Sequence, residues 1–150
     1  MTKNEMFDRA LKLAIEVNFN KTDSLDKPYS LFVLRVTQHF LHDLELSAIW
    51  LLHSVIDQST YTLYDAGSIG FSKRVLRALD CLHRRKDEQY ENYITRVCTN
   101  RDAVKVKIKI IKYNSSAAVL ESFDYKDFLR LQEYRKAYVR LVEADNKQVE

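Results

Sequence analysis

The chain has 150 residues, of which 46% are hydrophobic and 30% are charged. This balance is typical of a folded globular domain and excludes a disordered chain. Its formal net charge of +3 is too small to indicate nucleic-acid binding by itself. Only two Gly and one Pro are present to interrupt helices, so we expect an all-α protein with one domain over residues 1–150.

The cysteines and the N-terminal segment indicate a reduced, soluble protein. Cys81 and Cys98 form no Cys-x-x-Cys motif and no disulfide framework, so we expect reduced thiols. Residues 1–17 have the pattern of an amphipathic helix with acidic residues, without the basic start and apolar core of a signal peptide. The most apolar stretch, "LSAIWLL", is too short to cross a membrane. We therefore expect a cytoplasmic protein that does not bind membranes.

Apolar residues recur at helical spacing along most of the chain. The predicted helices are Asn4–Val17, a second one opened by Pro28, Leu46–Ile56, a short turn within 57–70, Phe71–His83, Glu88–Val97 and about Tyr125–Val142. The third of these is apolar nearly all round, so we expect it to be buried. Asp43 or Glu45 can begin it.

Residues 103–114, "AVKVKIKIIKYN", fit two patterns. Alternation of Val104, Val106 and Ile108 with lysines is typical of a half-exposed strand. The same residues also give a helical stripe of Val104, Ile108 and Ile111. Because a lone strand here has nothing to pair with, we expect a helix.

Several segments match, in order and spacing, the motifs of one enzyme family. "ALKLAIEV" and "KPYSLFVLRV" are followed by "AIWLLHSVIDQ", "RRKDEQYENYITRV", "AVKVKIKIIKYN" and "YKDFLRLQEYRKAYVRL". This series resembles the HD-domain metal-dependent phosphohydrolases, in particular the alarmone (ppGpp) hydrolase branch related to the RelA/SpoT hydrolases. The resemblance covers residues 10 to about 140. It implies a compact HD-domain-like bundle of about six to eight helices, and it also favours a helix for residues 103–114.

The resemblance implies a metal held by a His of the second helix, a His-Asp pair of the third and an Asp of a later helix. In this chain those four positions are Phe32, His53, Ser54 and Ile110, so three of the four ligands are replaced. The acidic pair that assists hydrolysis in the family falls on Asp57 and Gln58 and is half lost. A divalent metal needs several converging oxygen or imidazole ligands, so we expect neither a bound metal nor ordinary HD-type hydrolysis.

His53 by itself has a simpler interpretation, a buried histidine bonded to Ser54 or to a backbone carbonyl. A literal His-Asp pair occurs at His42 and Asp43, with His39 one turn earlier. These three side chains could bind a metal weakly. The pair lies at a helix end, however, where polar residues commonly cap the helix and contact solvent, so we interpret its resemblance to a metal-binding His-Asp pair as a coincidence.

The leading hypothesis is a catalytically inactive binding or regulatory protein on this fold that contacts a protein partner. Tyrosines are common at such surfaces, and the candidates are Tyr61, Tyr64, Tyr90 and Tyr93. An alternative is a metal-free binder of a phosphorylated, alarmone-like nucleotide in the former pocket. Its candidate ligand-binding residues are Lys21, Arg35, His53, Lys107, Lys109 and Asn114, although the lysines also fit a solvated helix face.

Two further hypotheses are less favoured. One is residual phosphohydrolase activity, with Mn²⁺ or Mg²⁺ or through His53 and Asp57 without the usual metal. The other is nucleic-acid binding through Arg84, Arg85 and Lys86 together with Arg101 and the lysines of residues 105–112. The small net charge gives this last hypothesis no independent support.

Overall fold

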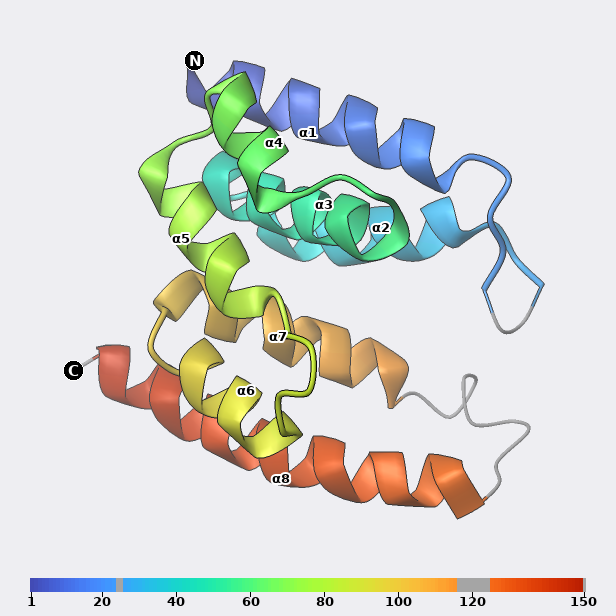
Figure 1. The fold of residues 1–150 in the computed structure, drawn as a ribbon, viewed down its shortest axis with the longest axis vertical. Coiled ribbons are helices and arrows are strands. Elements are labelled where there is room, and N and C mark those ends of the chain that lie inside the picture. The colour runs from blue at the N-terminus through green and yellow to red at the C-terminus, as the bar shows by residue number, and fades with distance from the viewer. Residues whose placement is uncertain (24–25, 116–124, 150) are drawn as a thin grey trace. The chain divides into compact units, whose positions relative to one another are not determined.

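The computed structural model describes residues 1–23, 26–115 and 125–149, and these residues form eight α-helices and one 3₁₀ turn (Figure 1). The all-α prediction is therefore confirmed. By contact density the chain falls into two compact units, Met1–His83 (unit 1) and Arg84–Glu150 (unit 2). Each unit is described below by itself, and the single domain over residues 1–150 stays a prediction.

Unit 1 is built around one buried helix, α3, against which α1, α2 and α5 pack. The elements of this unit are α1 (Lys3–Asn18), α2 (Tyr29–Thr37), η1 (Gln38–Phe40), α3 (Leu44–Gln58), α4 (Leu63–Ile69) and α5 (Lys73–Leu82). Every residue of α3 from Glu45 to Val55 is buried, as its apolar sequence predicted. Asp43 begins the helix, because its carboxylate accepts the backbone N–H groups of Glu45 and Leu46.

Unit 2 contains α6 (Tyr90–Val97), α7 (Arg101–Asn114) and α8 (Tyr125–Val149). Both α6 and α7 pack against α8. The predicted helix over 103–114 is confirmed, and Asn100 caps it by accepting the backbone N–H of Ala103. The strand-like alternation is explained by burial: α7 buries a wide face that includes Val104, Val106 and Ile108.

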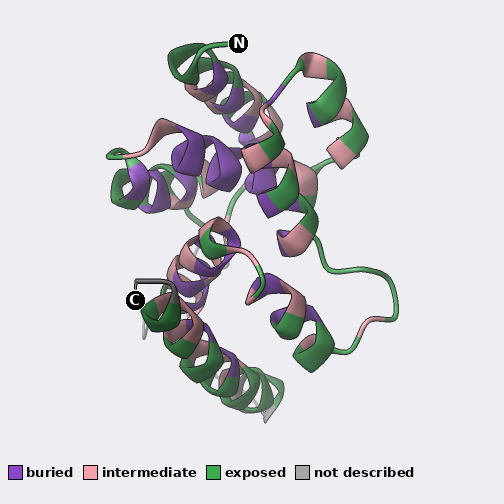
Figure 2. Ribbon diagram, turned by 90° about the vertical axis from the view of Figure 1, so that its left-hand side faces the viewer, coloured by how far each residue is buried: buried purple, intermediate pink, exposed green. Residues whose placement is uncertain are grey.

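Helix α8 is longer than predicted, because nothing in "EADNKQV" breaks a helix after Val142. Ala137 and Leu141 are buried, whereas Val139 is 51% exposed. Figure 2 shows α8, which ends at the C mark, exposed along much of its length. Much of this helix therefore remains available for contacts outside the chain.

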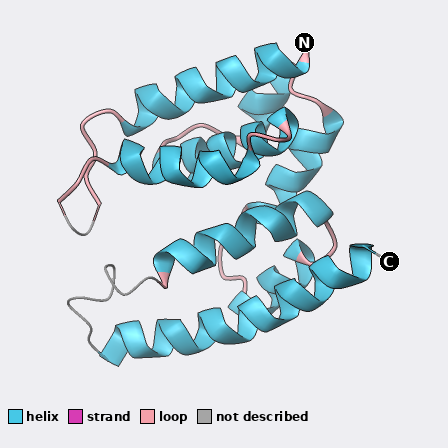
Figure 3. Ribbon diagram, turned by 180° about the vertical axis from the view of Figure 1, so that it is seen from behind, coloured by secondary structure: helices cyan, strands magenta, loops and turns pink. Residues whose placement is uncertain are grey.

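Within residues 1–23, 26–115 and 125–149 there is no β-strand, only a single bridge between Thr22 and Pro28 (Figure 3). Of the helices in these ranges, none combines the length and the apolar character needed to span a membrane. Cys81 and Cys98 are not joined in a disulfide, as expected.

Candidate functional site

His53, which the resemblance places in a metal site, lies in the last two turns of α3. It is 7% exposed, and its Nε2 atom lies 3.4 Å from Oδ2 of Asp57, one turn later on the same face. The neighbouring Ser54 donates its hydroxyl to the backbone oxygen of Leu51 at 2.6 Å. His53 is thus a buried histidine, and both side chains have partners within their own helix.

A row of aromatic side chains from α2 and α3 occupies the position where the resemblance places the first metal ligand. The ring of Phe32 lies edge-on to Trp50, with 5.6 Å between ring centroids, and Trp50 lies 6.3 Å from the imidazole of His53. Tyr29 extends the row at 5.3 Å from Phe32. Trp50 donates its indole N–H to the backbone oxygen of Val33 at 3.1 Å. The row is interior aromatic packing, which offers no lone pair to a metal.

Lys21 closes the C-terminal end of α3. Its ammonium group donates to the backbone oxygen of Gln58, the last residue of that helix. This placement is favourable because the final carbonyls of a helix carry partial negative charge. Burial and the charge of Asp57 raise the pKa of Tyr29, against the effect of its hydrogen bond with Gln58. Lys21 therefore has a structural role, whereas Arg35, the other predicted cation of this unit, is exposed on α2.

The literal His-Asp pair is a structural feature of the chain. Asp43 caps α3 and also pairs with Arg74 of α5, whose Nη2 atom lies 2.6 Å from Oδ2. The other nitrogen of the Arg74 fork lies 3.2 Å from Oε2 of Glu45. His39 and His42 are exposed. Among the residues that the structure describes, no group of three or more His, Cys, Asp or Glu side chains could hold a metal ion.

The remaining predicted positions lie on α7, in unit 2. Ile110 is buried at 8% exposure. The Lys107 ammonium lies 5.1 Å from the ring centre of Tyr93, and Asn114 hydrogen-bonds to Tyr134. Lys109 is half-buried. Tyr93 is only 2% exposed, so its prediction as a surface aromatic is wrong, because it packs on the inner face of α6.

The candidate residues thus form two groups. Lys21, Phe32, His53 and Gln58 gather around the last turns of α3 in unit 1, while the α7 residues of unit 2 are held by neighbours within that unit.

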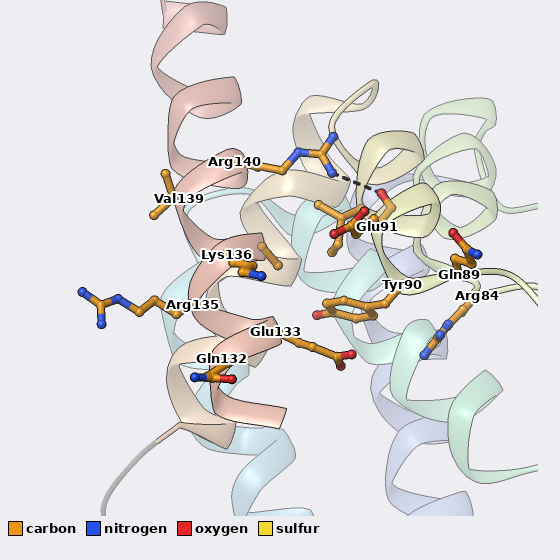
Figure 4. Close-up of a pocket in the computed structure, with 12 residues that line it drawn as sticks. Arg84, Gln89, Tyr90, Glu91, Gln132, Glu133, Arg135, Lys136, Val139 and Arg140 are labelled. Atoms are coloured by element: carbon orange, nitrogen blue, oxygen red, sulfur yellow. Dashed lines mark hydrogen bonds between the residues drawn. The ribbon is translucent and has the colours of Figure 1, made fainter. Parts of the chain in front are cut away.

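Unit 2 also contains an open groove of about 1130 Å³ between α6 and α8 (Figure 4), which we call the α6–α8 groove. Its apolar lining comes from Ile94, Ala137 and Val139. Its charged lining consists of four basic and two acidic residues, namely Arg84, Arg135, Lys136, Arg140, Glu91 and Glu133. The groove therefore combines an apolar surface with an excess of positive charge.

Two of the four basic side chains hold the walls of the groove. Arg140 of α8 donates to the backbone oxygen of Glu91 at 3.1 Å and to the hydroxyl of Thr95 at 2.7 Å, both on α6. Arg84 donates to the backbone oxygen of Glu88, and its guanidinium lies 5.3 Å from the ring centre of Tyr90. The Arg140 contacts join α8 to α6, and the Arg84 contacts hold the segment that leads into α6.

The other two basic side chains, Arg135 and Lys136, have no hydrogen-bond or ion-pair partner among the residues of the described ranges. Figure 4 shows them on successive positions of α8, with Arg135 directed away from α6. The four cations point in different directions and do not converge on one point (Figure 4). The arrangement thus suits a ligand that extends along α8 better than one compact anion.

Tyr90 forms part of the wall that α6 contributes. Its ring lies 5.9 Å from that of Tyr93 and 6.4 Å from that of Tyr134, and its hydroxyl is buried without a partner in the described part of the chain. Burial raises the pKa of this phenol far above its ordinary value of 10.0, and the neighbouring Tyr134 and Glu133 add to the effect. Tyr90 therefore stays neutral, and the charge of the groove comes from its Arg, Lys and Glu side chains.

The positive charge of the protein is concentrated in the unit that holds the groove. Residues 84–150 carry 15 of the 24 Lys and Arg residues and 11 of the 21 Asp and Glu residues, a formal charge of +4. Residues 1–83 carry the other 9 basic and 10 acidic residues, a formal charge of −1. The small net charge of the whole chain conceals this asymmetry.

Sequence reasoning found only part of the groove. It selected Arg84 and Tyr90, but it missed the outward face of α8, where Arg135, Lys136 and Val139 lie. The available signal was the run "YRKAYVR", in which two cations and an apolar residue share the face opposite the buried stripe. In sequence alone such a face is indistinguishable from an ordinary solvated one.

Comparison with known proteins adds no assignment. No protein-family model matches the chain, and no curated protein matches it. The likeness to HD-domain phosphohydrolases rests on the motifs quoted above.

Proposed function

We propose that the chain is a binding or regulatory protein without hydrolase activity, and that it holds a protein partner in the α6–α8 groove. The observation that carries this proposal is the lining of that groove. It places Lys136 and Arg135, which have no partner among the described residues, beside the exposed apolar side chain of Val139. Cations beside an apolar surface are typical of protein interfaces, where arginine and aromatic side chains are enriched.

The contacts at the family positions support a non-catalytic role. Hydrolysis by an HD-type site needs a metal to polarise the phosphoryl oxygen and to activate water. The positions that would hold it carry Phe32, His53, Ser54 and Ile110, and the one imidazole among them lies against Asp57. We therefore propose no metal cofactor for this chain.

A protein partner is favoured over a small nucleotide for two reasons. Two of the three lysines proposed for a phosphate are engaged within the protein, Lys21 by the end of α3 and Lys107 by the ring of Tyr93. In addition, the groove is open, whereas small-molecule sites bury most of the surface of their ligand. A segment of another protein fills such a surface better than a nucleotide does.

A photo-crosslinking experiment tests this proposal. The crosslinking amino acid p-benzoylphenylalanine is placed at Val139 in one variant and at Asn146 in another, two exposed positions of α8 of which only Val139 lines the groove. In cells that produce the protein naturally, we expect a discrete covalent adduct with one protein from position 139 and none from position 146. Equal labelling from both positions, or no protein adduct from either, would contradict the proposal.

A further inference from the structure

We propose, building on the function above, that the segment docking in the α6–α8 groove is an acidic, amphipathic helix of a partner protein. The charges of the groove give the first argument. Its lining contains four basic and two acidic side chains, and Arg135 and Lys136 have no counter-ion among the described residues. Carboxylates of a partner would supply the missing counter-charges, and such complementarity determines which partners are accepted.

The length of the lined surface sets the size of the segment. On α8 the lining runs from Gln132 to Arg140, which at 1.5 Å per residue corresponds to about 12 Å of helix. A partner helix of about two turns covers this distance. A groove between two helices is also the geometry in which amphipathic helices are commonly bound.

The apolar residues set the pattern of the segment. Val139 is 51% exposed, whereas Ile94 and Ala137, at 1% and 3% exposure, are already buried within unit 2. A helix with one apolar stripe covers Val139, while acidic residues flanking the stripe reach Lys136 and Arg135. Glu91 and Glu133 interrupt the positive lining, which disfavours a polyanion such as a nucleic acid, because its regularly spaced phosphates would meet these carboxylates.

The test uses the full chain and fluorescence anisotropy of synthetic peptides. The probe is a labelled amphipathic peptide of about 16 residues, long enough to form a helix, with a leucine stripe flanked by glutamates. A second peptide carries lysines in place of the glutamates, and a short single-stranded DNA serves as a nucleic-acid probe. We expect the acidic peptide to bind at least about tenfold more tightly than the basic one, with an affinity that falls as salt screens the charges.

Three variants locate the binding. Lys136→Glu should weaken binding of the acidic peptide about tenfold, because it reverses one positive charge of the groove lining. Glu133→Gln should strengthen binding, because it removes one negative charge of the lining. Arg101→Glu, at an exposed arginine of unit 2 outside the groove lining, should leave the affinity within about twofold. The gain expected for Glu133→Gln cannot be mimicked by a variant that merely fails to fold.

Several results would overturn the inference. These are equal binding of the two peptides, equal effects of Lys136→Glu and Arg101→Glu, or tighter binding of the DNA than of the acidic peptide. Failure of this inference can be distinguished from failure of the proposed function. A partner captured at position 139 without acidic-peptide binding leaves the proposed function standing, whereas absence of that adduct removes the proposed function itself.

Discussion

Replacing Arg74 with methionine tests whether the literal His-Asp pair of the sequence is a structural feature. Arg74 lies 2.6 Å from Asp43 and 3.2 Å from Glu45, with side-chain exposures of 37%, 28% and 11% for the three residues. Hydrogen bonds to charged groups contribute about 1.5–3 kcal/mol, and exposed ion pairs about 0.2–1 kcal/mol. The partial burial places this pair between the two ranges. We therefore expect Arg74→Met to lower the free energy of unfolding by about 1–1.5 kcal/mol.

Urea denaturation followed by the fluorescence of Trp50 measures this loss directly. Trp50 is the only tryptophan of the chain and lies in the same unit as Arg74, so its signal reports unfolding of that unit. Arg77→Met is the matched control, because Arg77 is an exposed arginine one turn later in α5. We expect the control to change the free energy of unfolding by less than about 0.5 kcal/mol.

The acid dependence of the same variant checks the sign of the electrostatic argument. Burial raises the pKa of Asp43, but its hydrogen bonds from Arg74 and from the backbone of Leu46 outweigh burial, so the pKa lies below its ordinary value of 3.8. A lowered pKa stabilises the fold above the ordinary value, and this stabilisation is lost as the pH falls through the lowered value. The difference between the wild type and Arg74→Met should therefore shrink below about pH 4. Equal stabilities of the Arg74→Met and Arg77→Met variants would refute the reasoning.

Three further predictions follow from single contacts. Phe32→Ala should cost about 2 kcal/mol, less than a fully buried phenylalanine, because the ring is half-buried. It should also shift the Trp50 emission to longer wavelength, because it removes the ring packed edge-on against the indole; an unchanged emission would contradict that packing. Tyr90→Phe should leave the stability unchanged or raise it, because the Tyr90 hydroxyl is buried without a partner among the described residues. Tyr134→Phe should lower the stability by about 1 kcal/mol, because it removes the hydrogen bond with Asn114. Urea denaturation followed by circular dichroism measures both, and the reverse order would contradict this account. The hydrogen bond from Arg96 lowers the pKa of Glu88 below its ordinary value of 4.5, so stability falls as the pH drops through the lowered value. Glu88→Gln should therefore flatten the acid side of the stability–pH curve. An unaltered curve would show that the pair contributes nothing.

The helices were largely predictable because their signals are local. Asp43 begins α3 as its type and position indicated, and the apolar sequence of that helix predicted its burial. Residues 103–114 form a helix although their alternation resembles a strand, since α7 buries a face wide enough to include the alternating Val104, Val106 and Ile108 as well as Ile111. The end of α8 was predicted too early, because the amphipathic pattern weakens after Val142 while the backbone meets no helix breaker.

The binding surface was less predictable, because it depends on which partner each charge finds in space. No feature of the neighbouring sequence distinguishes Lys21, which is engaged by the end of α3, from Lys136, which has no partner in the described ranges. Tyr93 and Tyr90 lie three positions apart on one helix, yet one is buried at 2% exposure and the other lines the groove. The contrast between the two tyrosines comes from α7 and α8 packing around α6, a contact between distant segments that periodicity does not encode.

The most direct test of the proposed non-catalytic binding function is a single thermal-shift assay in plate format. It contains purine nucleotides, alarmones, inorganic phosphates and the acidic amphipathic peptide, each with Mn²⁺ and again with EDTA. A ligand that binds only the folded chain raises its melting temperature by mass action, whatever chemistry follows. Our account predicts stabilisation by the acidic peptide alone, equal with Mn²⁺ and with EDTA. Stabilisation by a nucleotide or alarmone, with or without Mn²⁺, would contradict it.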